Sequence, residues 1–223
     1  MHIPDGFIDL PTSAAFAGAS ALAVAGAVKG ARKQLSEQSA PLAGLTAVFI
    51  FAVQMLNFPV AAGTSGHLIG AALAMVLVGP YAATLALVVV LIIQAFLFAD
   101  GGLTALGLSI FNMAVISVWV SFAVFMLLKK IFPKTKSWLV VATFISALIS
   151  VPAAAVGFVI QYAIGANATF SVGAVLNAMV GTHILIGIGE AIITALTVSA
   201  VLASRSDLVF GWDKKNTNLE IRS

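Results

Sequence analysis

The chain has 223 residues, of which 61% are hydrophobic and only 9% are charged, and its formal net charge is +3. A soluble core of this size cannot bury so much apolar surface, so the composition excludes a soluble globular protein and predicts an integral membrane protein. The chain contains no cysteine, which excludes disulfides and thiolate metal sites. Any transition metal must therefore be held by nitrogen or oxygen.

The first residues, Met1-His2-Ile3-Pro4-Asp5-Gly6, place a histidine directly beside the terminal amine. That amine, the His2 amide nitrogen and the His2 ring Nδ1 are joined by short covalent paths. One cation could thus close a five-membered and a six-membered chelate ring through them. Removing the amide proton requires a strongly binding divalent ion, which favours copper, nickel or cobalt over magnesium or calcium. The alternative is a solvent-exposed terminus without a ligand, and a fourth donor is needed to decide between the two.

Seven apolar runs follow, at about 12–29, 41–57, 62–78, 81–99, 106–130, 138–164 and 172–203. The runs are continuous rather than alternating, which is typical of membrane helices and not of the strands of a membrane barrel. Gly79-Pro80 separates the third run from the fourth, since together they would make one helix too long for a bilayer. We therefore predict an all-α bundle of seven transmembrane helices that forms a single domain over 1–203, with a polar tail at 204–223.

The basic residues indicate which way the chain crosses the membrane. All 11 Lys and Arg residues lie at the end of the first, fifth or seventh run or after it. Because positive charge is retained on the cytoplasmic side, this pattern predicts an outer N-terminus and a cytoplasmic C-terminus. The loops assigned to the outside carry only acidic charge.

A polar side chain inside a bilayer is costly unless it faces another helix or a wet cavity. His67, in Gly63-Thr64-Ser65-Gly66-His67, lies near the predicted outer end of the third run, on the same side as the amino terminus, and is the candidate fourth ligand. Several other polar residues share that outer half, and interhelical hydrogen bonding is the alternative explanation for each. The candidates for a supporting role are Asn57, Ser65, Asp100, Asn112 and Asn177.

His183 and Glu190 are seven residues apart in the last run, which places them on nearly one face of a helix. Glu190 is the only acid well inside a predicted span. The two residues could form a proton relay or an inner gate, or they could be a buried pair that is bonded to neighbouring helices.

Several ordered sequence blocks resemble the CbiM/NikM family, and together they extend over essentially the whole chain. The blocks are Met1-His2-Ile3-Pro4-Asp5-Gly6-Phe7, Gly63-Thr64-Ser65-Gly66-His67, Phe98-Ala99-Asp100-Gly101-Gly102-Leu103-Thr104-Ala105-Leu106-Gly107, Ile110-Phe111-Asn112-Met113, Gly181-Thr182-His183 and Gly187-Ile188-Gly189-Glu190. The family supplies the substrate-binding component of energy-coupling factor transporters for nickel or cobalt, in prokaryotic plasma membranes. The cobalt branch serves cobalamin biosynthesis.

The resemblance implies square-planar binding of Ni²⁺ or Co²⁺ by the Met1 amine, the His2 amide nitrogen, the His2 ring and the His67 ring. It also implies a transmembrane coupling subunit, cytoplasmic ATPases and a separate accessory membrane protein of the CbiN/NikN type, and it implies no nucleic-acid partner. The sequence has no G-x-x-x-x-G-K-[ST] phosphate loop, so we expect ATP hydrolysis in the partners. We expect no catalytic cofactor, because the metal is the transported substrate.

Two other function classes are compatible with the residues alone. One is an intramembrane metal-dependent hydrolase with Glu190 or Asp100 as the base, although no H-E-x-x-H motif is present. The other is a structural subunit of a membrane complex, in which the outer polar residues would serve only packing.

Overall fold

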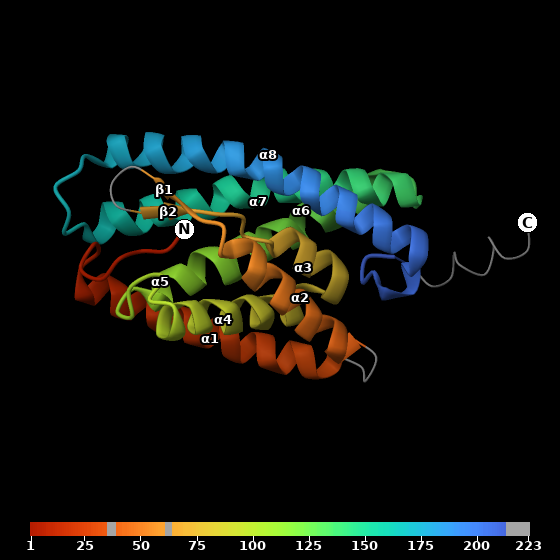
Figure 1. Cartoon of the computed structure of the whole chain (residues 1–223), viewed down its shortest axis with the longest axis horizontal. Helices are drawn as coiled ribbons and strands as arrows, with labels where there is room; N and C mark the ends of the chain where they lie inside the picture. The colour runs from red at the N-terminus through yellow and green to blue at the C-terminus, as the bar shows by residue number, and fades with distance from the viewer. Residues whose placement is uncertain (35–38, 61–63, 213–223) are drawn as a thin grey trace, which may run out of the picture.

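The computed structural model describes residues 1–34, 39–60 and 64–212 of a bundle whose helices run along its long axis (Figure 1). A π-helical turn, η2 (Phe111–Ile116), joins α5 to α6, and a 3-10 turn, η3 (Ser206–Leu208), follows the last helix. The helices are α1 (Leu10–Gln34), α2 (Ser39–Gln54), α3 (Ala71–Val78), α4 (Pro80–Leu97), α5 (Leu106–Ile110), α6 (Ser117–Ile131), α7 (Lys136–Gly165) and α8 (Val172–Ser204).

Five helical stretches are long and apolar enough to cross a membrane, namely 10–33, 80–97, 106–131, 136–165 and 172–204. They confirm the prediction of a mainly helical membrane protein. The second run forms α2, which has 16 residues, and α3 has only 8. At about 1.5 Å per residue, α3 extends about 12 Å and cannot cross a bilayer by itself. The count of seven full spans stays a prediction.

The third apolar run departs from the predicted helix. Strands β1 (Phe58–Val60) and β2 (Thr64–Gly66) form a small antiparallel hairpin, and the chain stays non-helical until α3 begins at Ala71. The prediction of a helix over 62–78 is therefore wrong for residues 64–70, which the structure describes as non-helical. The residue before α3, Gly70, has a φ of 79°, a left-handed conformation that glycine adopts without strain.

The helical part of the third run is buried inside the bundle. All eight residues of α3 are buried, and α3 contacts α2, α4, α6, α7 and α8. α3 and α4 lie against each other and are joined only by Gly79, so the chain turns at Gly79-Pro80, as the sequence predicts.

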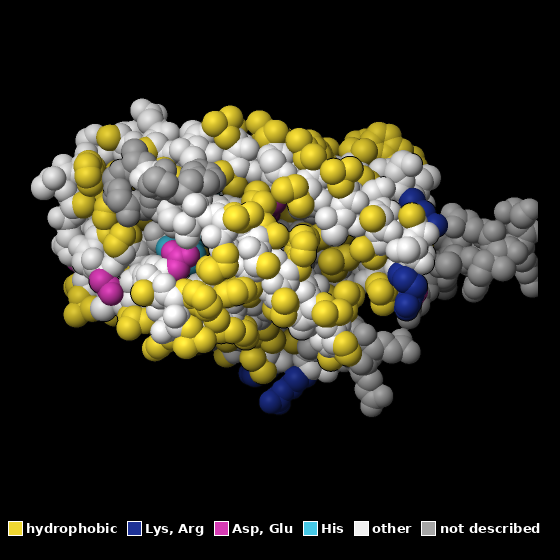
Figure 2. Space-filling model, in the orientation of Figure 1, with side chains coloured by type: hydrophobic (Ala, Val, Ile, Leu, Met, Phe, Trp, Pro, Cys, Tyr) yellow, Lys and Arg dark blue, Asp and Glu magenta, His cyan; other side chains and the backbone are white. Residues whose placement is uncertain are grey.

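Charge is distributed unevenly along the bundle. On the face shown in Figure 2, Lys and Arg side chains lie at the right and along the lower middle edge, whereas most of the visible acidic side chains and the histidines lie toward the left.

Residues 206–212 follow α8 and fold back, with the Phe210 N–H donating to Leu77 O at 3.3 Å. The rest of the predicted polar tail, 213–223, lies outside the described residues.

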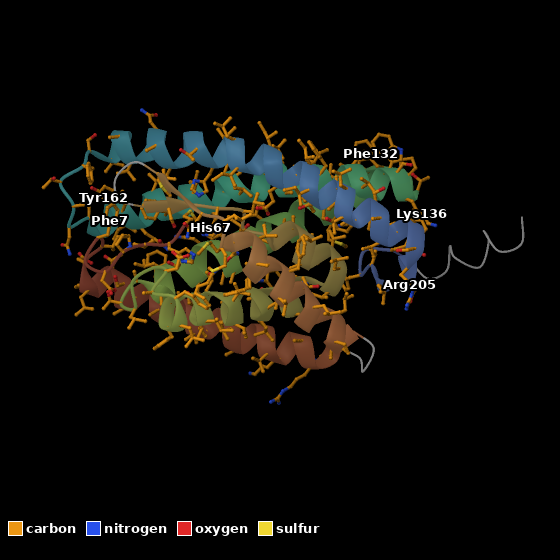
Figure 3. All side chains as sticks on the ribbon, viewed as in Figure 1. Phe7, His67, Phe132, Lys136, Tyr162 and Arg205 are labelled. Atoms are coloured by element: carbon orange, nitrogen blue, oxygen red, sulfur yellow. The ribbon has the colours of Figure 1, made fainter. Side chains whose placement is uncertain are left out.

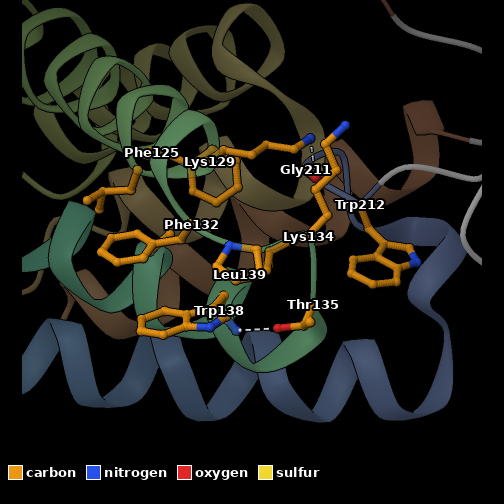
Figure 4. Close-up of a pocket in the computed structure, with 12 residues that line it drawn as sticks. Phe125, Lys129, Phe132, Lys134, Thr135, Trp138, Leu139, Gly211 and Trp212 are labelled. Atoms are coloured by element: carbon orange, nitrogen blue, oxygen red, sulfur yellow. Dashed lines mark hydrogen bonds between the residues drawn. The ribbon is translucent and has the colours of Figure 1, made fainter.

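A pocket lies between the α6–α7 connection and the residues after α8 (Figure 4). Its wall includes Phe132, Trp138 and Trp212. Figure 3 places Phe132 and Lys136 toward the end of the bundle opposite Phe7 and Tyr162, so this pocket does not adjoin His67.

Candidate metal centre

The amino-terminal segment folds back into the bundle. Met1 and Ile3 are fully buried. The Gly102 N–H donates to Ile3 O at 2.8 Å, and the Asp9 N–H donates to Gly165 O at 2.7 Å. The segment is thus tied to the α4–α5 connection on one side and to the end of α7 on the other, and the terminal amine lies inside the protein.

Phe7 anchors the same segment at one end of the bundle (Figure 3). Its ring centroid lies 5.9 Å from that of Phe158 and 5.2 Å from that of Tyr162, both on α7. Aromatic pairs at such distances contribute about 0.5–1.5 kcal/mol beyond the area that they bury. These contacts fix where residues 1–6 enter the bundle.

His67 meets the terminal amine. Its Nε2 contacts the Met1 nitrogen, and its ring stacks on that of His2 with a centroid distance of 4.8 Å and an interplanar angle of 28°. The His67 Nδ1 lies 2.8 Å from Leu68 O. Because a carbonyl oxygen only accepts, Nδ1 must carry the proton, and Nε2 has a lone pair available for a metal.

Asp100 faces the His2 ring. The His2 Nε2 lies 3.5 Å from Asp100 Oδ2, an electrostatic contact that does not meet hydrogen-bond geometry. The Asn57 Nδ2 donates to the same carboxylate oxygen at 3.0 Å. A carboxylate on one ring nitrogen favours the proton there and leaves Nδ1 as the donor, which is the atom that the chelate requires. The His2 amide N–H points to Ser65 Oγ at 3.3 Å.

The connection between α4 and α5, residues 98–105, packs against the N-terminal segment. Asp5 Oδ1 accepts from the Thr104 N–H at 2.8 Å and from the Thr104 hydroxyl at 2.5 Å. A Cβ at Gly102 would lie 2.4 Å from the Asp5 amide nitrogen, and one at Gly101 would lie 3.2 Å from His2 Nδ1. The two glycines therefore permit a close approach that a side chain would prevent.

Burial keeps the terminal amine and the His2 ring uncharged. Desolvation lowers the pKa of the Met1 amine from 8.0 to about 4, although the nearby Asp100 carboxylate acts in the opposite direction. Desolvation, with a smaller contribution from the charge of the amine, lowers the pKa of His2 from 6.5 to about 3. Burial raises the pKa of Asp100 itself, against the effects of the amine and Asn57. Near neutral pH the amine and the His2 ring are thus uncharged, as metal ligands must be.

The structure brings together most of the residues that the sequence singled out. Met1, His2 and His67 meet directly, and Asn57, Ser65 and Asp100 bond to them or to one another. Two features of this site were not predicted from the sequence: the Asp5–Thr104 contact, and Gln54, whose Nε2 donates to Ile69 O at 2.7 Å. No sequence signal distinguishes Gln54 from the other polar residues of the spans.

The remaining candidates have different surroundings. Asn112 is buried and donates to Gln161 Oε1 at 2.7 Å, an interhelical bond of the kind that was the alternative explanation. His183 is buried, with Nδ1 2.7 Å from Met179 O. Asn177 is exposed on the surface of α8, and the structure does not bring it to Met1, His2 and His67. It lies close to the beginning of its helix, where a polar side chain at a membrane interface has little cost.

Side chains alone do not make a metal site here. Among the residues that the structure describes, no group of three or more His, Cys, Asp and Glu side chains could hold an ion. A centre at His2 and His67 must therefore recruit main-chain nitrogen, and the buried amine of Met1 is in contact with the His67 ring.

Comparison with known proteins gives one family. A family model described as the cobalt uptake substrate-specific transmembrane region of CbiM matches residues 2–208. A candidate metal transport protein of Haloquadratum walsbyi is 39% identical over 221 residues, which cover 98% of this chain and 97% of the relative. The cobalt transport protein CbiM of Sorangium cellulosum is 31% identical over 217 residues, or 94% of each chain. A crystal structure of a truncated transition metal transporter is 32% identical, with a TM-score of 0.84 over 91% of this chain and 99% of that one.

Proposed function

Because the chain belongs to the CbiM family of cobalt-uptake membrane proteins, we propose that it is the substrate-capture component of a Ni²⁺ or Co²⁺ importer. In this proposal the ion is bound by the Met1 amine, the His2 amide nitrogen, His2 Nδ1 and His67 Nε2. The observation that carries it is the contact of a buried terminal amine with the His67 ring, beside the stacked ring of His2.

The donor set explains the class of metal. Nitrogen donors that include a deprotonated amide favour ions late in the first-row affinity order and exclude Mg²⁺ and Ca²⁺. Square-planar nitrogen suits low-spin Ni²⁺, and Cu²⁺ suits the same geometry. The bound Ni²⁺ or Co²⁺ centre carries a net charge of +1 after loss of the amide proton, and Asp100 lies where it offsets that charge.

Transport requires partners that this chain does not replace. We propose that the N-terminal end of the bundle faces outward and the lysine-rich end faces the cytoplasm, supported by the charge distribution in Figure 2. A transmembrane coupling subunit and cytoplasmic ATPases would then drive release inward. Nickel transport proteins named as fused NikMN occur among the relatives, for example in Rhodobacter capsulatus, with 41% identity over 127 residues that cover 57% of this chain and 37% of that protein. They support an accessory subunit of the NikN type.

The relatives are named as transport proteins, so the chain is a transport component and not an enzyme. This outcome overrides the metal-dependent hydrolase that the residues alone left open. If the chain were a purely structural subunit, the isolated protein would bind no divalent ion. A metal titration therefore distinguishes this alternative from the capture function.

Replacement of His67 by alanine should weaken Ni²⁺ binding to the detergent-solubilised chain by about 100-fold, because a pre-positioned donor is lost from a multidentate site. Isothermal titration calorimetry measures the change. Asn177→Ala is the matched control, since it removes an exposed polar side chain from the same membrane half and should leave the affinity unchanged. An unaltered titration for His67→Ala would refute the ligand assignment.

Binding at pH 7 should release about one proton per Ni²⁺. The pKa values of about 4 for the amine and about 3 for His2 mean that both groups are already neutral, so only the amide proton is displaced. An exposed terminus with ordinary pKa values would release about two. The affinity should accordingly rise about tenfold per pH unit near neutrality. Calorimetry in buffers of different ionisation enthalpy counts the protons, and a count of two at pH 7 would contradict the buried, neutral amine.

A further inference from the structure

The segment that carries His67 lies between β2 and α3 and has no regular secondary structure of its own. Side chains from two other helices hold it. Glu190 of α8, which is only 2% exposed, accepts from the Ile69 N–H at 2.6 Å and from the Gly70 N–H at 3.0 Å. Gln54 of α2 donates to Ile69 O at 2.7 Å. The two oxygens of Glu190 therefore serve backbone groups that immediately follow the proposed ligand.

One of these bonds reaches His67 through a single peptide group. The N–H of Ile69 and the C=O of Leu68 belong to the same planar amide. Glu190 accepts from the Ile69 N–H of this amide. The Leu68 oxygen of the same amide lies 2.8 Å from the His67 Nδ1 and accepts its proton. The peptide unit is rigid, so fixing one end fixes the other. Hydrogen bonds in such a chain also polarise one another, and the carboxylate makes the Leu68 carbonyl a stronger acceptor.

The effect on the imidazole follows from the chemistry of histidine ligands. A strong acceptor at Nδ1 fixes the tautomer, orients the ring and makes Nε2 a better electron donor. His67 has no carboxylate of its own at Nδ1, unlike His2, whose ring nitrogen faces Asp100 directly. Glu190 supplies the same kind of support from one peptide group further away.

We propose that Glu190 is a positioning residue for metal capture, acting on the His67 ligand through the Leu68–Ile69 peptide group. It also takes the place of a capping side chain at the start of α3, where Gly70 offers none. The inference rests on the proposed function, because it assigns His67 as a ligand. It replaces the proton relay or inner gate that the spacing of His183 and Glu190 suggested.

A double-mutant cycle on Ni²⁺ affinity tests the proposal. Glu190→Gln keeps the side-chain size but places an amide NH₂ against backbone N–H groups. It should weaken binding by about 10- to 100-fold, the usual effect of removing support from a metal ligand. In the His67→Ala background the same change should cost less than about twofold, because the ligand that Glu190 serves is gone. Thr194→Val, a buried change on the same helix, is the control and should not alter the affinity.

The absorption of the bound Ni²⁺ gives a second readout. Glu190→Gln and His67→Ala should shift the ligand-field band in the same direction, toward lower energy, since both weaken the same donor. Glu190→Asp, which retains both acceptor oxygens, should recover part of the loss, and it carries the test if Glu190→Gln does not fold.

The outcomes separate the two proposals. Equal losses from Glu190→Gln in both backgrounds would mean a general structural role and would overturn the positioning proposal alone. An undiminished affinity in Glu190→Gln would overturn it as well. If His67→Ala itself binds Ni²⁺ normally, the ligand assignment fails, and with it the proposed function.

Discussion

Nickel binding should be lost when the amino terminus is extended and should return when the extension is cleaved off. Met1 is fully buried and its amine contacts His67, so an extension removes a donor and has no space to occupy inside the bundle. Every side chain of the site remains. Because the amine shares its chelate ring with the His2 amide, its loss should weaken binding by at least about 10³-fold.

The experiment uses one polypeptide in two states. A fusion that ends in a protease site directly before Met1 is purified in detergent and titrated with Ni²⁺ before and after cleavage, and intact mass verifies that Met1 is free. An equivalent extension at the C-terminus is the control and should have no effect. Equal affinities before and after cleavage would exclude the terminal amine as a ligand, whatever happens in the His67 variant.

The sequence predicts the long helices well, because a continuous apolar run of about 20 residues has few other structures available in a membrane. The runs near 81–99, 106–130, 138–164 and 172–203 correspond closely to helical stretches in the structure. The run at 62–78 does not, since an apolar composition reports burial and not conformation. Residues 66–70 are buried or half-buried, and side chains of other helices satisfy part of their backbone, as Glu190 and Gln54 do for Ile69.

The candidate site was predictable to the extent that covalent structure determines it. Adjacency of Met1 and His2 supplies three potential donors in any conformation, whereas the contact with His67 joins residues that are 66 positions apart. The role of Glu190 could not be read from spacing. Its seven-residue separation from His183 suggested a shared helix face, but its hydrogen bonds go to a backbone segment 120 and 121 positions away. Asn177 was grouped with the site by its depth in the membrane, but its side chain is exposed on α8, because shared depth does not imply a shared direction.

Replacement of His2 by alanine should have the second-largest effect of the variants considered, about 10³-fold on Ni²⁺ affinity. The change removes the ring donor and the six-membered chelate ring, and it leaves the Asp100 carboxylate facing the centre without its histidine. His67 contributes one donor from a separate segment, so His67→Ala should reduce the Ni²⁺ affinity less than His2→Ala does. Asp100→Asn keeps the ring but weakens its orientation, and should cost about tenfold. The expected order of losses is therefore His2→Ala, then His67→Ala, then Asp100→Asn, in calorimetric titrations under one condition. A smaller loss for His2→Ala than for His67→Ala would show that the ion is not held by a chelate centred on the second residue.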